Sequence, residues 1–236
     1  MHPASTTTPE HQDYAPQHEF LDRCVRGTDR ARSGEALRRY FGHDGNQPYT
    51  GSWFERFAGG GDRANDANVV TEADVLALNF LSITDLAHVA IDVTTGYPDQ
   101  IRDLLEQIPV NVPMHEALWT HYSPGSPADQ LWEIFKHCGG KNRWVTANKL
   151  LARKRPHLLP VYDNQVKALL GAPTSFWACL WTWFDSDSTR AEALSNLRAN
   201  AGGIDDISLL RCLDVILWMR ATSEPGTEAT EAGPSA

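Results

Sequence analysis

The residues from Lys136 to Lys167 read KHCGGKNRWVTANKLLARKRPHLLPVYDNQVK. Apolar residues recur at helical spacing through the middle of this stretch, which predicts a helix over residues 143–154 that Pro156 ends. Pro160 then begins an extended Pro-Val-Tyr-Asp segment, and Asp163 stands where a second helix, residues 164–170, should start. Two helices joined by a short extended link favour a helical fold.

The same stretch carries eight Lys and Arg against one acid, Asp163, in a chain whose formal net charge is -9. On the predicted helix, Lys149, Arg153 and Lys154 are expected to face outward, opposite the apolar residues. A local concentration of positive charge attracts polyanions and speeds their association, so it indicates a phosphate or nucleic-acid partner. For the cations at the helix end, solvation is an equal alternative, because the helix dipole favours them there anyway.

Helix signals dominate the rest of the chain. Thr71 and Ser126 each begin an N-cap pattern, and Pro98 suits the first residue of a helix. Asp205 and Asp206 precede a final apolar helix, which they are predicted to cap. Aromatic residues and glycines mix over residues 49–62, which predicts an ordered loop or a short strand pair.

These signals predict an all-α fold with a single helical domain over residues 19–220, in which residues 136–171 form one motif. A hydrophobic content of 42% suffices for a core. Residues 1–18 and 221–236 lack the apolar residues that a core needs and are predicted to be disordered tails. Six carboxylates in residues 1–19 and 221–236 account for most of the net negative charge.

The chain contains four scattered cysteines, no Cys-x-x-Cys pair and no N-terminal apolar segment typical of a signal peptide. We therefore expect reduced thiols in a cytoplasmic protein. No apolar run approaches the length of a membrane span, so no membrane partner is expected. The nine histidines show no zinc-like spacing, and neither a metal nor another cofactor is predicted.

Asp163 has two interpretations. A carboxylate at this position accepts hydrogen bonds from the free N–H groups of the first helical turn, which is an ordinary capping role. The surrounding cations would also keep the carboxylate ionised, and the proline-led approach would fix its direction. The second interpretation makes Asp163 the candidate catalytic residue.

The segments Trp144-Val-Thr-Ala147 and Val161-Tyr-Asp-Asn-Gln-Val166, at this spacing, resemble the helix–hairpin–helix DNA glycosylases over about 35 residues. The resemblance implies that Asp163 matches the family's catalytic aspartate, which stabilises the oxocarbenium charge as a base leaves. It also implies DNA contacts, for which the candidates are Lys141, Arg143, Thr146, Lys149, Arg153 and Arg155.

This chain departs from the glycosylase pattern at the hairpin. Lys141 and Arg143 stand where the family has glycines whose N–H groups approach a phosphate. Val145 stands in place of the lysine of the bifunctional enzymes, which disfavours lyase chemistry, and Tyr162 is an extra residue before Asp163. The chain is also similar over a longer range, from Tyr49 through Asp163, to a mainly actinobacterial family of uncharacterised proteins, which implies no function.

Four aromatic residues near the motif are candidates for a substrate pocket: Trp53, Tyr49, Tyr162 and Trp144. Aromatic rings at loops and helix starts can stack on bases, although packing is the commoner role for any single one. The leading hypothesis is a DNA-associated, monofunctional N-glycosylase-like protein. The alternatives are a non-catalytic nucleic-acid-binding module, or an enzyme that acts on a small molecule in a closed aromatic pocket containing Asp163. The sequence predicts neither a substrate nor an oligomeric state.

Overall fold

A computed structural model describes residues 8–223, and across that range it contains helices and no strand. The predicted all-α fold is therefore confirmed. The α-helices are α1 (Ala15–Val25), α2 (Arg30–Phe41), α3 (Glu72–Asn79), α4 (Ala87–Ile91), α5 (Pro98–Leu105), α6 (Pro127–Lys136), α7 (Trp144–Lys154), α8 (Asn164–Leu169), α9 (Phe176–Asp185), α10 (Thr189–Ala201) and α11 (Leu209–Ser223). Short 3-10 turns and one π-helical turn, Asp92–Gly96, connect them.

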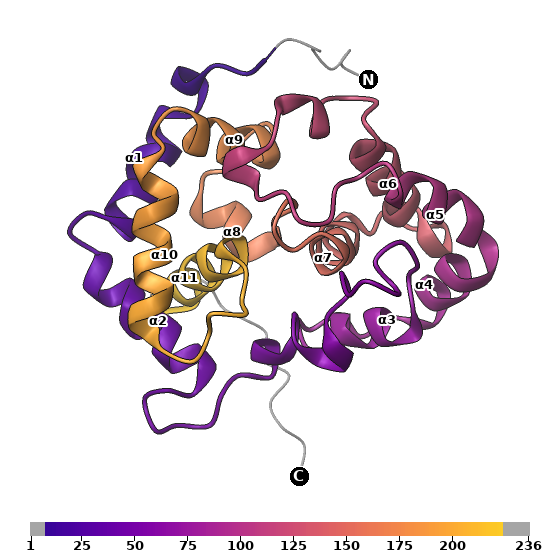
Figure 1. The fold of residues 1–236 in the computed structure, drawn as a ribbon, viewed down its shortest axis with the longest axis horizontal. Helices are drawn as coiled ribbons and strands as arrows, with labels where there is room; N and C mark the ends of the chain where they lie inside the picture. Colours follow the sequence, from indigo (N-terminus) through magenta and orange to yellow (C-terminus); the bar gives the residue numbers. More distant parts are fainter. Residues whose placement is uncertain (1–7, 224–236) are drawn as a thin grey trace.

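The helices pack in two groups that share one hydrophobic core (Figure 1). The helices α1, α2, α10 and α11 form the first group, and α3 to α7 form the second. The short helix α8 packs against α11, while α6 packs along α7. The segment from α7 to α8 therefore passes between the two groups, which places Asp163 deep in the domain.

Helix caps lie largely where the sequence predicts them. The Thr71 side chain accepts a hydrogen bond from the N–H of Asp74 at 3.3 Å, and the Asp74 carboxylate accepts one from the N–H of Thr71 in return. Ser126 caps α6 through the N–H of Asp129. These capping bonds satisfy N–H groups that have no partner within the helix, which is why the pattern predicts these helix starts well.

Three sequence predictions need correction. The region around Tyr49 forms a 3-10 turn, Thr50–Trp53, instead of a strand pair. Ser208 begins the last helix, because its Oγ accepts a hydrogen bond from the N–H of Arg211, whereas Asp205 and Asp206 lie earlier in the loop. Helix α1 begins at Ala15, inside the predicted N-terminal tail, and α11 reaches Ser223. Residues 1–7 and 224–236 of those tails lie outside the described residues.

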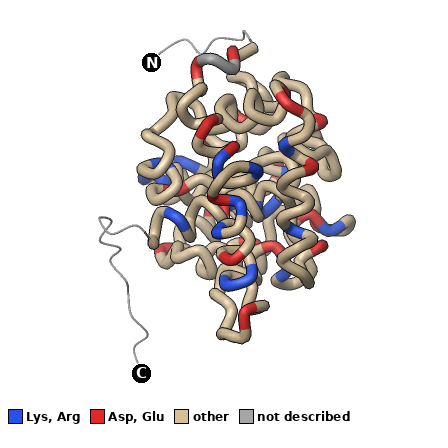
Figure 2. Tube along the Cα trace, turned by 90° about the vertical axis from the view of Figure 1, so that its left-hand side faces the viewer, with Lys and Arg blue, Asp and Glu red and all other residues tan. Residues whose placement is uncertain are grey.

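The cations at the end of α7 also depart from expectation. Arg153, Lys154 and Arg155, here called the RKR triplet, are buried instead of facing solvent, and Lys149 is buried with them. The outward orientation predicted for Lys149, Arg153 and Lys154 is therefore wrong. A side chain so deeply buried contacts no phosphate in this conformation. Figure 2 shows that positive and negative residues are interspersed along the trace.

The RKR triplet ties α7 to segments far away in the sequence. Arg153 donates to the Asp74 carboxylate at 3.0 Å and to the Phe57 carbonyl, while Lys154 donates to the other Asp74 oxygen at 2.9 Å. Arg155 meets only backbone carbonyls and one amide, and its guanidinium donates to the carbonyls of Ala67, Leu105 and Ile108 and to Asn68 Oδ1. Burial accordingly lowers the pKa of Arg155 to about 10.

Removing the single carboxylate of this cluster should be costly. Asp74→Asn leaves two buried cations without their counter-charge, so we expect a loss of about 3–5 kcal/mol in the free energy of unfolding. Urea denaturation measures this loss. Asp85→Asn is the matched control, because the Asp85 carboxylate, which also pairs with two cations, Lys141 and Arg143, is itself about half exposed, so its loss should change stability little. Equal losses in both variants would contradict the structural role of Asp74.

The four cysteines are buried and form no disulfide. Burial raises the pKa of Cys24 and Cys138 to about 11 and that of Cys179 and Cys212 to about 12. The thiolate is the reactive form, so the folded protein should resist Ellman's reagent near neutral pH. All four thiols should react after denaturation, and rapid reaction of any thiol in the folded protein would contradict this prediction.

Candidate active site

Asp163 begins helix α8 and caps it. Its Oδ1 atom accepts hydrogen bonds from the N–H groups of Gln165 at 3.0 Å and Val166 at 3.1 Å, so the predicted capping role is confirmed. The other oxygen, Oδ2, lies 3.7 Å from the Nζ of Lys149. One oxygen of Asp163 thus caps the helix, and the second faces the Lys149 ammonium.

Asp163 lines a narrow cavity of about 100 Å³, here called the Asp163 cavity. Lys149 also lines it, and its ammonium donates to the Leu81 carbonyl at 2.8 Å. Burial lowers the pKa of Lys149 despite the nearby Asp163 carboxylate. The cavity therefore contains a positive charge whose hydration has been replaced by a carbonyl and a carboxylate.

Two further charged residues reach this cavity from α11. Arg211 forms an ion pair with Asp214 and also donates to the hydroxyl of Tyr40 at 2.6 Å and to the Gly51 carbonyl. Asp214 Oδ1 is buried and accepts no hydrogen bond from any described residue. Burial, reinforced by the nearby Asp163 charge, raises the pKa of Asp214 to about 6. Asp214 can therefore take up or release a proton near neutral pH.

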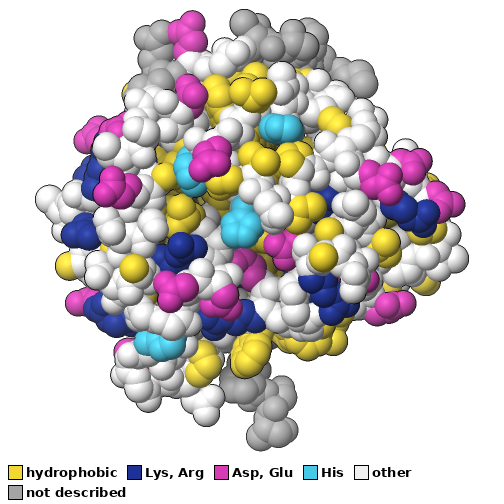
Figure 3. Space-filling model, in the orientation of Figure 1, with side chains coloured by type: hydrophobic (Ala, Val, Ile, Leu, Met, Phe, Trp, Pro, Cys, Tyr) yellow, Lys and Arg dark blue, Asp and Glu magenta, His cyan; other side chains and the backbone are white. Residues whose placement is uncertain are grey.

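Aromatic rings close one side of the Asp163 cavity. Tyr40 and Tyr49 stack in parallel with their ring centroids 5.1 Å apart, and Trp218 meets both edge-on. Figure 3 shows one face of the domain, where the described surface mixes hydrophobic, acidic and basic side chains without one continuous basic patch. The cavity combines two carboxylates, two cations and an aromatic wall.

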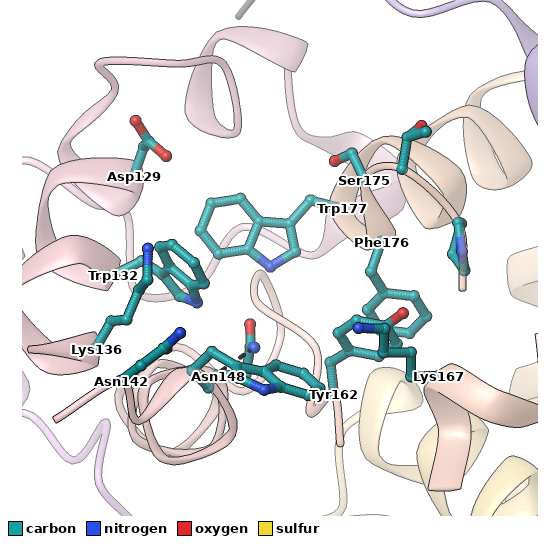
Figure 4. A pocket seen from close by; sticks show the side chains of 13 residues that line it. Asp129, Trp132, Lys136, Asn142, Asn148, Tyr162, Lys167, Ser175, Phe176 and Trp177 are labelled. Carbon is teal, nitrogen blue, oxygen red and sulfur yellow. Dashed lines mark hydrogen bonds between the residues drawn. The ribbon is translucent and has the colours of Figure 1, made fainter. Parts of the chain in front are cut away.

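The structure separates the predicted pocket residues into two places. The extended segment 160–163 alternates its side chains, so Val161 and Asp163 line the Asp163 cavity while Tyr162 points to the opposite side. Of the four predicted aromatic residues, Tyr49 joins Asp163. Tyr162 and Trp144 instead line a second, open cleft of about 490 Å³, shown in Figure 4. Trp53 is 56% exposed and lines neither.

The predicted nucleic-acid contacts are also dispersed. Lys141 is exposed but pairs with Asp85 at 3.2 Å, and the largely buried Arg143 pairs with the same carboxylate at 2.7 Å. Thr146 is buried on α7, and Arg153 and Arg155 belong to the RKR triplet. The structure thus brings only Lys149 of these six residues to the side of Asp163.

Sequence reasoning missed Arg211 and Asp214. Both stand in the final helix, which the sequence otherwise fills with apolar residues, and three positions separate them, as for neighbours on one helical face. Charged residues within an apolar helix are a usable signal, because burying them requires partners. Two further partners of Arg211, Tyr40 and Gly51, are distant in the sequence, and no local pattern identifies them.

Among the described residues, no group of three or more His, Cys, Asp or Glu is arranged to hold a metal ion. None of the described helices combines the length and apolar character that crossing a membrane requires.

Comparison with known proteins places the chain in a family. The model of a family of unknown function (DUF6308) matches residues 33–221, and the chain belongs to that family. No curated protein and no solved structure gave a significant match. The matched range contains both carboxylates of the Asp163 cavity and the RKR triplet.

The raised pKa of Asp214 predicts how the stability of the protein depends on pH. Since the folded protein holds this proton more tightly than the unfolded chain, ionising Asp214 costs stability as the pH rises from about 4 to about 6. The free energy of unfolding of the wild type, minus that of Asp214→Asn, should therefore fall through this window and level off above it. Urea denaturation at a series of pH values measures the difference. A difference independent of pH would show that Asp214 is ionised throughout.

Proposed function

We propose that this protein is a hydrolase that cleaves an N-glycosidic bond of a small molecule, with its chemistry in the Asp163 cavity. The observation that carries the proposal is the pairing of two unlike carboxylates there. Asp163 is a capping carboxylate whose Oδ2 faces a lysine, while Asp214 is a buried acid with a free oxygen and a raised pKa. Carboxylates held in different environments can divide acid and charge-stabilising roles between them.

The two carboxylates would act in sequence. Asp163 stabilises the positive charge that develops on the sugar as the C–N bond breaks, as fixed charge does in other active sites. Protonated Asp214 gives its proton to the departing nitrogen. Water then adds to the sugar carbon and returns a proton to Asp214, so the enzyme ends unchanged and the products are a free base and a sugar hydroxyl.

Several features favour a small molecule over DNA as the substrate. The cations expected to hold a DNA backbone are mostly buried, and Lys141 shares its charge with Asp85. The cavity volume corresponds to several water molecules, which suits the reacting part of a small substrate. The resemblance of the Val161–Val166 segment to the glycosylases supports the type of bond, and it contributes nothing to the choice of substrate.

The test is release of free base, measured by chromatography, from nucleosides, nucleotides and duplexes with uracil, hypoxanthine or alkylated bases. We expect activity on one of the small substrates. Asp163→Asn should reduce it by about a hundredfold or more, because an amide cannot balance the developing positive charge. Asparagine also caps helices well, so this variant should remain folded.

Asp187→Asn is the matched control, because Asp187 accepts the Thr189 N–H at the start of α10 and lines neither cavity. Its activity should equal that of the wild type. Release of free base from the duplexes alone would show that the substrate of this reaction is DNA and would contradict the choice of a small molecule. Unchanged activity in Asp163→Asn would refute the role of Asp163, and the absence of release from every substrate would refute the proposed reaction.

A further inference from the structure

We propose that the second cleft, here called the aromatic cleft, binds a mononucleotide through its planar base and its phosphate. This site is separate from the Asp163 cavity, and the proposal does not depend on the hydrolysis proposed above. Three features of the cleft suit this ligand: its aromatic walls, a buried acceptor at its floor and a cation at its rim.

Three indoles form the walls. Trp132 comes from α6, Trp144 from the start of α7 and Trp177 from the start of α9, so segments distant in the sequence converge on one space (Figure 4). All three are only partly buried. Tyr162 and Phe176 line the same cleft beside them and stack on each other with ring centroids 4.0 Å apart. Such walls offer flat apolar faces to a ring, and stacking on them accepts any base.

The floor presents a fixed hydrogen-bond acceptor. Asn148 is 5% exposed, and its Nδ2 donates to the Trp144 carbonyl at 2.9 Å. This bond sets the direction of the amide, so Oδ1 points up into the space beneath Trp177 (Figure 4). A carbonyl oxygen in this position accepts an N–H from the edge of a ligand ring. Nucleobases carry such N–H groups in the ring plane, whereas simple aromatic hydrocarbons do not.

The rim carries two lysines of unequal availability. Lys136 lies over Trp132 and shares its charge with Glu133 at 3.1 Å. Lys167 lies over Trp144, with its Nζ 5.2 Å from the ring centroid, and no carboxylate of the described residues forms an ion pair with it. The acid of the cleft, Asp129, accepts the Gly125 N–H through Oδ2 at 2.8 Å and forms no ion pair with a described lysine. Lys167 is therefore the cation that would receive a phosphate.

These features exclude two other ligand classes. An aromatic cage for a quaternary ammonium needs a rim free of positive charge, and here two lysines would repel the ligand. A single strand of nucleic acid needs a basic track for successive phosphates, whereas the charges of this protein are interspersed. One base with one phosphate matches both the volume of about 490 Å³ and the one lysine, among the described residues that line the cleft, that forms no ion pair.

Calorimetric titration of the full chain tests the proposal, with AMP, GMP, CMP and UMP, their nucleosides, and inorganic phosphate as ligands. We expect at least one nucleotide to bind more tightly than its nucleoside, and phosphate alone to bind poorly. Trp177→Leu should weaken nucleotide binding about tenfold, because stacking is lost. Trp53→Leu, an exposed tryptophan outside the cleft, should leave it unchanged.

The lysine variants separate phosphate from base recognition. Lys167→Gln should weaken the nucleotide several-fold and its nucleoside little, whereas Lys141→Gln removes an equal charge outside the cleft and should alter neither. Thermal unfolding confirms that the variants are folded, and Asp163→Asn should bind like the wild type. The proposal is overturned if no nucleotide binds at millimolar concentration, if phosphate alone binds equally well, or if Trp177→Leu and Lys167→Gln bind like their controls.

Discussion

The burial of three consecutive cations beside one carboxylate is the constraint on which the domain depends. The RKR triplet lies at the C-terminal end of α7. It contacts Asp74, carbonyls of the loop before α3 and carbonyls at the end of α5 and just after it. Moving such charges out of water is costly, so each donor needs an acceptor in place. The segments around residues 54–68, which contain no α-helix, provide many of these acceptors, and the bonds to the triplet hold them against α7.

The helices could be predicted from the sequence because their signals are local. Thr71, Ser126 and Asp163 mark helix starts through hydrogen bonds that span two or three residues. The side on which a charged residue lies is not a local property. Arg153 and Lys154 read as solvent-facing on a helical projection, yet their acceptors stand 79 or more positions earlier. Nothing in the neighbouring sequence distinguishes a cation that binds a phosphate from one that binds a carbonyl.

The candidate site shows the same division. The sequence identified Asp163 and Tyr49, and the fold brings both to one cavity. Tyr162, next to Asp163 in the chain, lies on the other side, because successive residues of an extended segment point in opposite directions. One segment of four residues therefore separates a small charged cavity from a large aromatic cleft. Proximity in the sequence alone would have merged these two sites.

The long reach of the RKR triplet has a consequence for synthesis of the chain. During translation the first half of the domain, including Asp74 and the loop carbonyls, leaves the ribosome well before the cations that complete it. Closing contacts separated by 79 to 99 residues is entropically costly. Residues 54–108 therefore leave the ribosome before the cations that their acceptors bind in the folded domain. The contacts that tie α7 to residues 54–108 can therefore form only after the middle of the chain has been made.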